Sequence, residues 1–440
     1  MPCSEKLRVA CSLGGAYTAL SINGVLPVLH SGPGCLGQAR AVLAASNGGQ
    51  SSFPYQENIV PCSDFTESQV VFGGVENLRK VVSQSLEAYK AEALVVLEGC
   101  TPAIIGDDVE EVVGSFAGSK IPVLFASTVG FKGDNIQGHT LVLKALIDGL
   151  LEPPAKRSDR QVNIFGIVPY YDAFWEGTLE ALGELLKAVG LEPNILYGLD
   201  NGLDKFRKIP EAAFNLVISP WIDVGIAQDL EKRFGTPYLQ QTHLPIGPTE
   251  TTKFLRRLAN FAELDRNVVE AVIKREERRY YYYVQKALPW IYRCKALPKE
   301  FFLLGGSGTA LSVTKFLVND IGLIPRAVYV TEDVPDEHRE RVVELFSDLE
   351  AKADFPVIVG SDGGIFEATA TTETVQGRPA IFGSVLDEIY AKENLLPFVS
   401  ISTPLGNNLV GESHYFGYQG GIRLFHEFYS AAAGSAVNLL

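Results

Sequence analysis

The sequence lacks long apolar runs. No hydrophobic stretch approaches the roughly 20 residues that a membrane-spanning helix needs, which argues against an integral membrane protein. The first residues, MPCSEKLRVACSLGG, also lack the basic-then-apolar pattern of a secretory signal, so we expect a cytoplasmic protein. Positive charge is in deficit as well: the formal net charge is −14, which argues against a general nucleic-acid-binding protein.

Cysteine is scarce, with six residues in a chain of 440. Cysteines of a cytoplasmic protein are more often free, catalytic or metal-bound than paired in disulfides. Nucleotide-binding motifs are missing too. If the function of the chain requires ATP hydrolysis, we expect another protein to carry it out. The segment LLGGSGTA (303–310) lacks both the last glycine of the dinucleotide fingerprint and the lysine of a phosphate loop. We therefore expect it to be a tight turn between a strand and a helix.

Strand and helix patterns alternate along the chain, and composition is ordinary, with 46% hydrophobic and 20% charged residues. This alternation predicts an α/β protein with mainly parallel sheets flanked by helices. A helix is expected near 178–190, and turn plus helix at 101–119. Short apolar runs predict buried strands at 92–99, 121–127, 162–170, 215–220, 300–306, 355–361, 379–384 and 396–402.

Composition shifts suggest the domain organisation. A Pro-rich, charged linker at 152–161 and a second break after a long helix predict three Rossmann-like domains. Their expected limits are 1–150, 162–293 and 294–425, with a C-terminal tail at 426–440.

Three cysteines and a serine are the candidate functional residues: Cys11 in CSLGGAYTAL, Cys35 in HSGPGC, Cys100 in LEGCTPAIIGDDV and Ser127 in FASTVG. Each cysteine is expected where a strand gives way to a turn with glycine or proline. Such turns let the backbone approach a bulky inorganic ligand, and thiolates are the preferred protein ligands of iron–sulfur clusters. A single cysteine in an α/β core is more often buried and inert; three in this ordered context favour a metal-binding role.

These segments resemble the β subunit of nitrogenase component 1 and of its nitrogenase-like relatives. The resemblance rests on CSLGGAYTALSINGVLPVLHSGPGC, SDFTESQVVFGGVENLRKVV and EGCTPAIIGDDVEEV, which occur in the family's order and at similar distances. Two later segments match as well, THLPIGPTETTKFLRRLANF (242–261) and YFGYQGGIRLFHEFYSA (415–431). The resemblance covers nearly the whole chain, and the ordered combination of motifs is far more specific than any one of them.

The resemblance implies a cofactor and its ligands. Family members hold an iron–sulfur cluster shared between α and β subunits through cysteines that match Cys11, Cys35 and Cys100. Ser127 matches the serine that adds an oxygen ligand to an oxidised [8Fe–7S] P-cluster, although the preceding proline of that pattern is absent. The resemblance thus implies a P-cluster or, as an alternative, a [4Fe–4S] cluster at a domain and subunit interface.

The resemblance also implies partners. The α subunits of the family hold the substrate-reducing cofactor through a second-domain cysteine and a C-terminal histidine. Residues 162–293 contain no cysteine, and the surroundings of Cys294 and His414 are not those of the α-type motif. The chain is therefore expected to relay electrons within an α2β2 heterotetramer served by an ATP-dependent homodimeric iron protein, with no nucleic acid or membrane partner.

The HSGPGC turn departs from the form common in molybdenum nitrogenases, and the chain lacks their long N-terminal extension. Both features favour the nitrogenase-like branch, with the β subunit of methylthio-alkane reductase, which cleaves C–S bonds, as first choice. A molybdenum-independent nitrogenase, a scaffold for cofactor assembly and a tetrapyrrole reductase remain alternatives.

Other candidates have plainer interpretations. Asp107 and Asp108 are expected to open a helix, where negative charge suits the helix dipole. His30 is equally consistent with a hydrogen bond near the cluster and with a structural role. The basic and aromatic run at 274–292 favours packing between domains over binding to single-stranded nucleic acid. The remaining cysteines, Cys3, Cys62 and Cys294, are expected not to bind metal.

Overall fold

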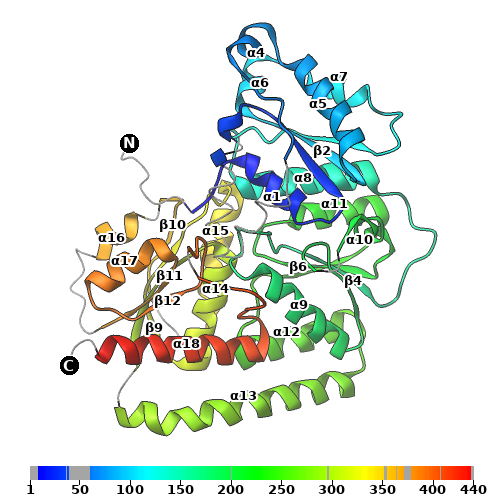
Figure 1. Cartoon of the computed structure of the whole chain (residues 1–440). Helices are drawn as coiled ribbons and strands as arrows, with labels where there is room; N and C mark the ends of the chain where they lie inside the picture. Colours follow the sequence, from blue (N-terminus) through cyan, green and yellow to red (C-terminus); the bar gives the residue numbers. More distant parts are fainter. Residues whose placement is uncertain are drawn as a thin grey trace.

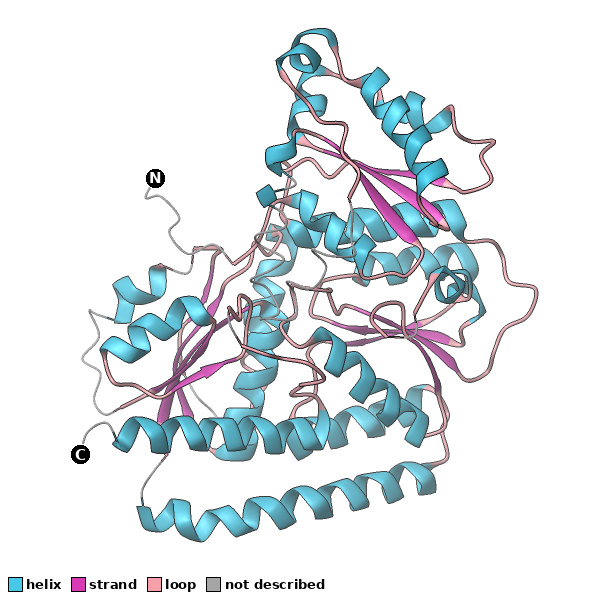
Figure 2. Cartoon of the chain, viewed as in Figure 1, coloured by secondary structure: helices cyan, strands magenta, loops and turns pink. Residues whose placement is uncertain are grey.

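The computed structural model describes residues 8–35, 37–38, 60–199, 201–294, 297–350, 354–362, 364–370, 378–406 and 408–437. Three separate parallel sheets, each flanked by helices, make up the architecture (Figures 1 and 2). Each sheet with its helices is called a lobe, and the lobes are numbered in chain order. The predicted fold class is confirmed. Among the described residues, no helix combines the length and the apolar character needed to cross a bilayer.

The first sheet carries the cysteine segments. Its order is β1 (Val25–His30), β2 (Ala93–Glu98) and β3 (Val123–Ala126), with β2 buried along its whole length. Buried parallel strands read as continuous apolar runs, as VLPVLH and ALVVLE do. The helices of this lobe are η1 (Ser12–Gly14), α1 (Gly15–Leu20), α4 (Glu67–Phe72), α5 (Val75–Ala88), α6 (Cys100–Ile105), α7 (Val109–Gly114) and α8 (Asn135–Leu150).

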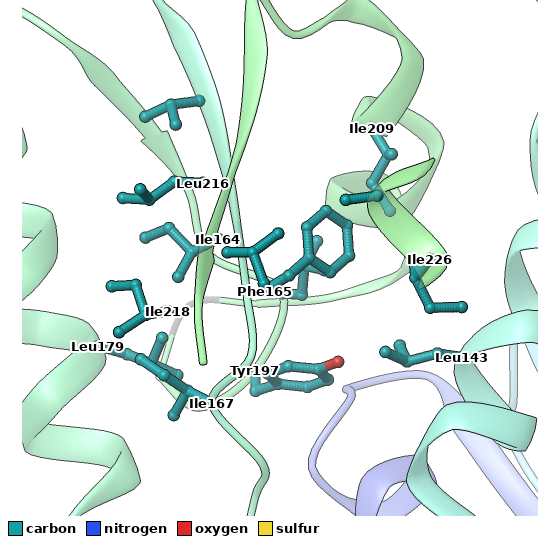
Figure 3. Packing of buried hydrophobic residues seen from close by; sticks show 14 of the residues in the cluster. Leu143, Ile164, Phe165, Ile167, Leu179, Tyr197, Ile209, Leu216, Ile218 and Ile226 are labelled. Atoms are coloured by element: carbon teal, nitrogen blue, oxygen red, sulfur yellow. The ribbon is translucent and has the colours of Figure 1, made fainter. Parts of the chain in front are cut away.

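The second sheet has the order β5-β4-β6-β7. Its strands are β4 (Gln161–Phe165), β5 (Glu192–Asn194), β6 (Phe214–Ile218) and β7 (Tyr238–Gln241). Figure 3 shows apolar side chains of this lobe, among them Ile164 and Phe165 of β4 and Leu216 and Ile218 of β6, in one cluster with Tyr197 and with Leu143 from α8. The helices are α9 (Trp175–Ala188), α10 (Leu203–Arg207), η3 (Ile209–Glu211), α11 (Val224–Phe234), α12 (Gly247–Phe261) and α13 (Arg266–Cys294).

The third sheet has the order β10-β9-β8-β11-β12. Its strands are β8 (Glu300–Gly305), β9 (Ile324–Val330), β10 (Val357–Val359), β11 (Ala380–Gly383) and β12 (Phe398–Ser400). The helices are α14 (Ser307–Phe316), η4 (Leu317–Ile321), α15 (Asp336–Leu345), α16 (Ile365–Ala370), α17 (Val385–Glu393) and α18 (Gly417–Val437). Figure 1 shows α18 and α13 running side by side along the second and third lobes, and the two helices are in contact.

Each predicted strand overlaps an observed one. Besides β1, which corresponds to the strand expected before Cys35, the strands β5, β7 and β9 are additional. Those three escape the apolar pattern because β5 and β7 are short and polar and β9 contains proline. Pro325 cannot donate to the sheet, and the pairing of β8 with β9 shifts register next to it. The predicted helix at 101–119 is instead two short helices, α6 and α7, separated by Gly106 at φ +79°.

The proposed domain limits coincide with these sheets only in part. The connection before β4 lies in the predicted linker, but residues of the first and second lobes share one apolar core. At the C-terminus, α18 continues past residue 425, and Phe428 is fully buried in the core of the third lobe. The limits of the three domains remain a proposal.

Asp172 is a buried carboxyl group at the junction of the second and third lobes. Its Oδ2 accepts a hydrogen bond from the Val168 amide at 2.6 Å. Burial raises the pKa of Asp172 from its ordinary value of 3.8 to about 7, and the charge of Glu332 adds to the rise. The folded state therefore holds more protons than the unfolded state between these two pKa values, so this group makes stability fall as pH rises from about 4 to about 7.

Asp172→Asn is expected to stabilise the protein at pH 8, by roughly 2–4 kcal/mol, because the amide oxygen can still accept the bond while the buried charge is removed. The gain should shrink toward pH 4, where the folded aspartate is already neutral. Thermal unfolding at both pH values measures it, with the exposed Asp229→Asn as the control. An equal gain at both pH values would contradict the assigned cause.

Candidate metal centre

Cys11 lies at the start of η1, where two distant segments of the first lobe meet. It forms an isolated antiparallel bridge with Asp134, and the Ser12 amide donates to the Gly133 carbonyl at 3.0 Å. Close packing of η1 against α8 requires Gly138, since a Cβ there would lie 1.9 Å from the Ser12 carbonyl oxygen. The prediction that Cys11 follows a strand is wrong, because the described residues before it, 8–10, are not a strand.

Cys35 and Cys100 follow the ends of adjacent strands, as predicted. Cys35 comes shortly after β1, and its amide donates to the Gly32 carbonyl at 3.2 Å. Cys100 is the first residue of α6, directly after β2 and the N-cap Gly99. Because β1 and β2 pair in parallel up to His30 and Glu98, their carboxyl ends bring both cysteines to one edge of the sheet.

The three thiols gather at this edge. A Cβ added at Gly130 would lie 3.3 Å from the Cys100 Sγ and 3.4 Å from the Cys11 Sγ, so these two thiols flank the same backbone position. Partial desolvation of its sulfur raises the pKa of the Cys11 thiol, although the residue as a whole is exposed, and negative charge on Cys100 and Cys35 raises it further. All three cysteines are free, with Cys11 and Cys35 exposed and Cys100 half-buried.

The donor set fits an iron–sulfur cluster better than a single ion. The described residues contain no group of three or more His, Cys, Asp or Glu side chains that could hold one metal ion. Thiols that share a site without converging on one point suit a cluster whose iron atoms are spread over several ångströms. Gly130 leaves the space beside two of the sulfurs open.

Ser127 lies directly after β3 at the same edge, but its hydroxyl is already engaged. Its Oγ donates to the Glu98 Oε2 at 2.6 Å, and the Thr128 hydroxyl donates to the Glu98 carbonyl oxygen at 3.1 Å. Glu98 is 8% exposed and ends a strand that is otherwise apolar. Sequence reasoning missed Glu98, although an acidic residue at the end of a buried strand is itself an available signal.

His30 belongs to a structural network behind the thiols. Its Nδ1 hydrogen-bonds with the Ser63 hydroxyl at 2.9 Å, and its Nε2 hydrogen-bonds with the Asp107 Oδ2 at 3.2 Å. Asp107 also accepts from the Gly74 amide at 2.9 Å. Both ring nitrogens are thus occupied, which favours the structural interpretation of His30. Asp108 caps α7 as predicted, whereas Asp107 links the turn at Gly74 to His30.

The other predictions for this chain have separate outcomes. The Cys62 thiol donates to the Ser31 carbonyl oxygen at 3.2 Å, consistent with a structural role. Cys3 and the side chain of Cys294 lie outside the described residues.

The segment 303–310 is the expected turn between β8 and α14. On α13, Tyr280 is buried in the core of the third lobe and Val284 and Ile291 pack against it, in line with the predicted packing role. Tyrosines 281, 282 and 283 are exposed.

A family model for nitrogenase component 1 type oxidoreductases matches residues 11–433. The chain belongs to this family. It is 23% identical to a nitrogenase molybdenum-iron protein beta chain of Nostoc, over 94% of this chain and 80% of the relative. It is 25% identical to one of the chains of a light-independent protochlorophyllide reductase of Chaetosphaeridium globosum, over 79% of this chain and 69% of the relative. The family predicted from the motifs is confirmed.

A solved structure titled nitrogenase Cp1 at pH 6.5 has the same fold. Its TM-score is 0.80, at 20% sequence identity, and the match covers 99% of this chain and 94% of the other. The likeness extends over all three lobes, which confirms the predicted architecture.

Proposed function

We propose that this chain is the β subunit of a nitrogenase-like reductase and relays electrons through an iron–sulfur cluster to a cofactor held by an α subunit. The gathering of the Cys11, Cys35 and Cys100 thiols at one sheet edge carries the proposal. A cluster bound there would supply one-electron steps between a donor protein and the α subunit.

The exposure of the thiols supports a shared site. Cys11 and Cys35 are exposed on the isolated chain, whereas shielding from solvent is one of the means by which a protein sets the potential of a cluster. A partner that supplies further thiolates and covers this face would exclude water from it. We propose an α subunit in an α2β2 assembly as that partner, an [8Fe–7S] cluster with [4Fe–4S] as the alternative, and a cytoplasmic location.

The side chains around the thiols have distinct roles in this proposal. Glu98 holds the Ser127 hydroxyl at the sheet edge that also carries Cys100, where Ser127 would be the candidate oxygen ligand of the cluster. Gly130 keeps the space beside Cys11 and Cys100 free. The bonds from Asp107 to His30 and to the Gly74 amide hold the turn after α4 against the lobe that carries the thiols.

An exposed apolar patch near the thiols fits the docking of an electron donor. It consists of Val70, Val71 and Phe72 on α4 and Ile104 on α6, the helix that begins at Cys100. Phe72 is 86% exposed, and α4 contacts α6. Contiguous exposed apolar residues mark interaction sites. We propose that the ATP-dependent iron protein docks here, within a short distance of the cluster.

Phe72→Asp is expected to lower electron delivery by about tenfold or more, since a buried aromatic anchor at an interface contributes about 2 kcal/mol. Steady-state reduction with the iron protein measures this at several donor concentrations. Stability and iron content should not change, because Phe72 makes no core contact. Ile389→Asp, exposed on α17, is the matched control. Equal activity of both variants would place docking elsewhere.

The HSGPGC turn favours a methylthio-alkane reductase type of complex, which cleaves C–S bonds. A molybdenum-independent nitrogenase remains an alternative, and so do a cofactor-assembly scaffold and a tetrapyrrole reductase. Turnover of small methyl thioethers, dinitrogen and protochlorophyllide by the purified complex distinguishes the three reductases from one another.

Anaerobic co-purification with the α partner tests the proposal first. Iron content and electron paramagnetic resonance spectra of reduced and oxidised samples are the readouts. About eight irons per αβ pair, with further iron in the partner, is the expected result. A single four-iron signal would move the assignment to the tetrapyrrole-reductase type, and a complex without any cluster would refute the electron-relay role.

A further inference from the structure

A cavity of about 70 Å³ lies between the second and third sheets, and none of the described residues that line it is a cysteine. The loop after β4, the ends of β6 and β12 and the first turns of α14 bound it. These are the carboxyl ends of parallel strands from two sheets that face each other. Ligands of α/β proteins bind at such ends, and nothing in the proposed electron relay uses this one.

The walls of the cavity are mainly aliphatic and aromatic, and its polar groups are acidic or neutral. Apolar contributions include Ile167, Ile218 and Val313, while Glu332 and Asp172 bring carboxyl groups. None of the described residues that line it is lysine, arginine or histidine. An anionic ligand would find no counter-charge on these side chains.

Glu332 is the central polar group. It is 1% exposed, and its two oxygens accept hydrogen bonds from neutral donors: Tyr171 Oη to Oε2 at 2.6 Å and Trp221 Nε1 to Oε1 at 2.9 Å. The carboxylate is therefore oriented, but in the described part of the chain it has no basic partner. Gly306 makes this position possible, since a Cβ there would lie 2.8 Å from Oε2.

The surroundings add negative charge. Asp172 lines the cavity, and its carboxyl group interacts electrostatically with those of Glu332 and Asp223. His139 hydrogen-bonds to Asp223 at 3.3 Å. A buried carboxylate is costly when no cation balances its charge, so a positive ligand beside Glu332 would be stabilised.

We propose that this cavity binds a small primary alkylammonium ion, with its ammonium group on Glu332 and its alkyl group against Ile167, Ile218 and Val313. The cavity has about half the volume of one that admits benzene (~150 Å³), so the alkyl chain has at most about three carbons. A bare metal ion is not favoured, because no group of three acidic, His or Cys side chains in the described residues could hold one.

Calorimetric titration of the full-length protein, purified with its α partner, tests the proposal at constant chloride concentration. The probes are n-propylammonium, 1-propanol and propionate, which share their size and differ in charge. Propylammonium is expected to bind at one site per copy of this chain, at least about tenfold more tightly than the other two, as a charge-assisted hydrogen bond predicts. Equal binding of all three, or no binding of propylammonium, would overturn the proposal.

Two variants locate the site. Glu332→Gln should weaken propylammonium binding at least about tenfold, because it removes the charge and keeps the shape. Tyr171→Phe should retain or strengthen binding, because Oε2 loses its internal donor while the carboxylate stays. Unchanged binding in E332Q, or loss in Y171F, would overturn the assignment. If Glu332→Gln does not fold, the comparison of the three probes and the binding measured for Tyr171→Phe still test the proposal. The outcome is independent of the cluster, since iron content is measured separately.

Discussion

Replacing Cys100 with alanine is expected to remove nearly all cluster iron from the αβ interface. Cys100 begins α6 at the sheet edge, and its Sγ faces the same position, Gly130, as Cys11 does. Losing a thiolate leaves part of the cluster without the soft, anionic ligand that its iron prefers. Iron analysis and electron paramagnetic resonance of the anaerobically purified complex measure the loss, and electron transfer to the partner should fall in parallel.

Cys62→Ala is the matched control for Cys100→Ala. Cys62 lies in the same lobe and packs beside β1, but its thiol donates to the Ser31 carbonyl oxygen and has no assigned metal role. Iron content should stay at the level of the unmodified protein in this variant. Full iron content and full activity in both variants would refute the ligand assignment, whereas loss in both would indicate that the lobe as a whole was disturbed.

Arg8→Ala is expected to destabilise the folded chain by about 3–5 kcal/mol, because it leaves a buried carboxylate without its partner. Arg8 donates through Nη2 to the Asp387 Oδ1 at 2.6 Å and through Nη1 to Oδ2 at 2.8 Å. Both side chains are almost fully buried, 2% and 1% exposed. The pair joins the segment before Cys11 to the start of α17 in the third lobe, so its loss should also loosen Cys11.

Thermal unfolding and the rate of limited proteolysis measure the effect of Arg8→Ala. Asp387→Ala should resemble it, while the double variant Arg8→Met, Asp387→Leu should recover much of the stability, because neither charge is then buried alone. Lys187→Ala removes one partner of an exposed pair with Glu184 and should change stability by less than about 0.5 kcal/mol. A comparable loss in Lys187→Ala would contradict the role of burial.

Local sequence patterns predicted most strands, the position of Cys100 and one helix cap. Apolar runs such as ALVVLE predicted buried parallel strands because both faces of these sheets are covered by helices. The position of Cys100 after such a run placed its thiol at the carboxyl end of a strand. The capping role of Asp108 was also readable, since a short acidic side chain before a helix satisfies free amides. Polar or proline-containing strands such as β9 escaped, because their periodicity is broken.

The sequence by itself determined the chemistry of the site: which thiols exist, their order along the chain, the family and the class of fold. Only the tertiary structure decided which of these side chains are in contact with one another. Gly130 lies between Cys11 and Cys100, Glu98 binds Ser127, Arg8 reaches Asp387, and Glu332 faces a cavity between two sheets. Such contacts join residues far apart in the chain, and they depend on how whole helices and sheets pack. Local periodicity, capping and turn signals carry no record of that packing.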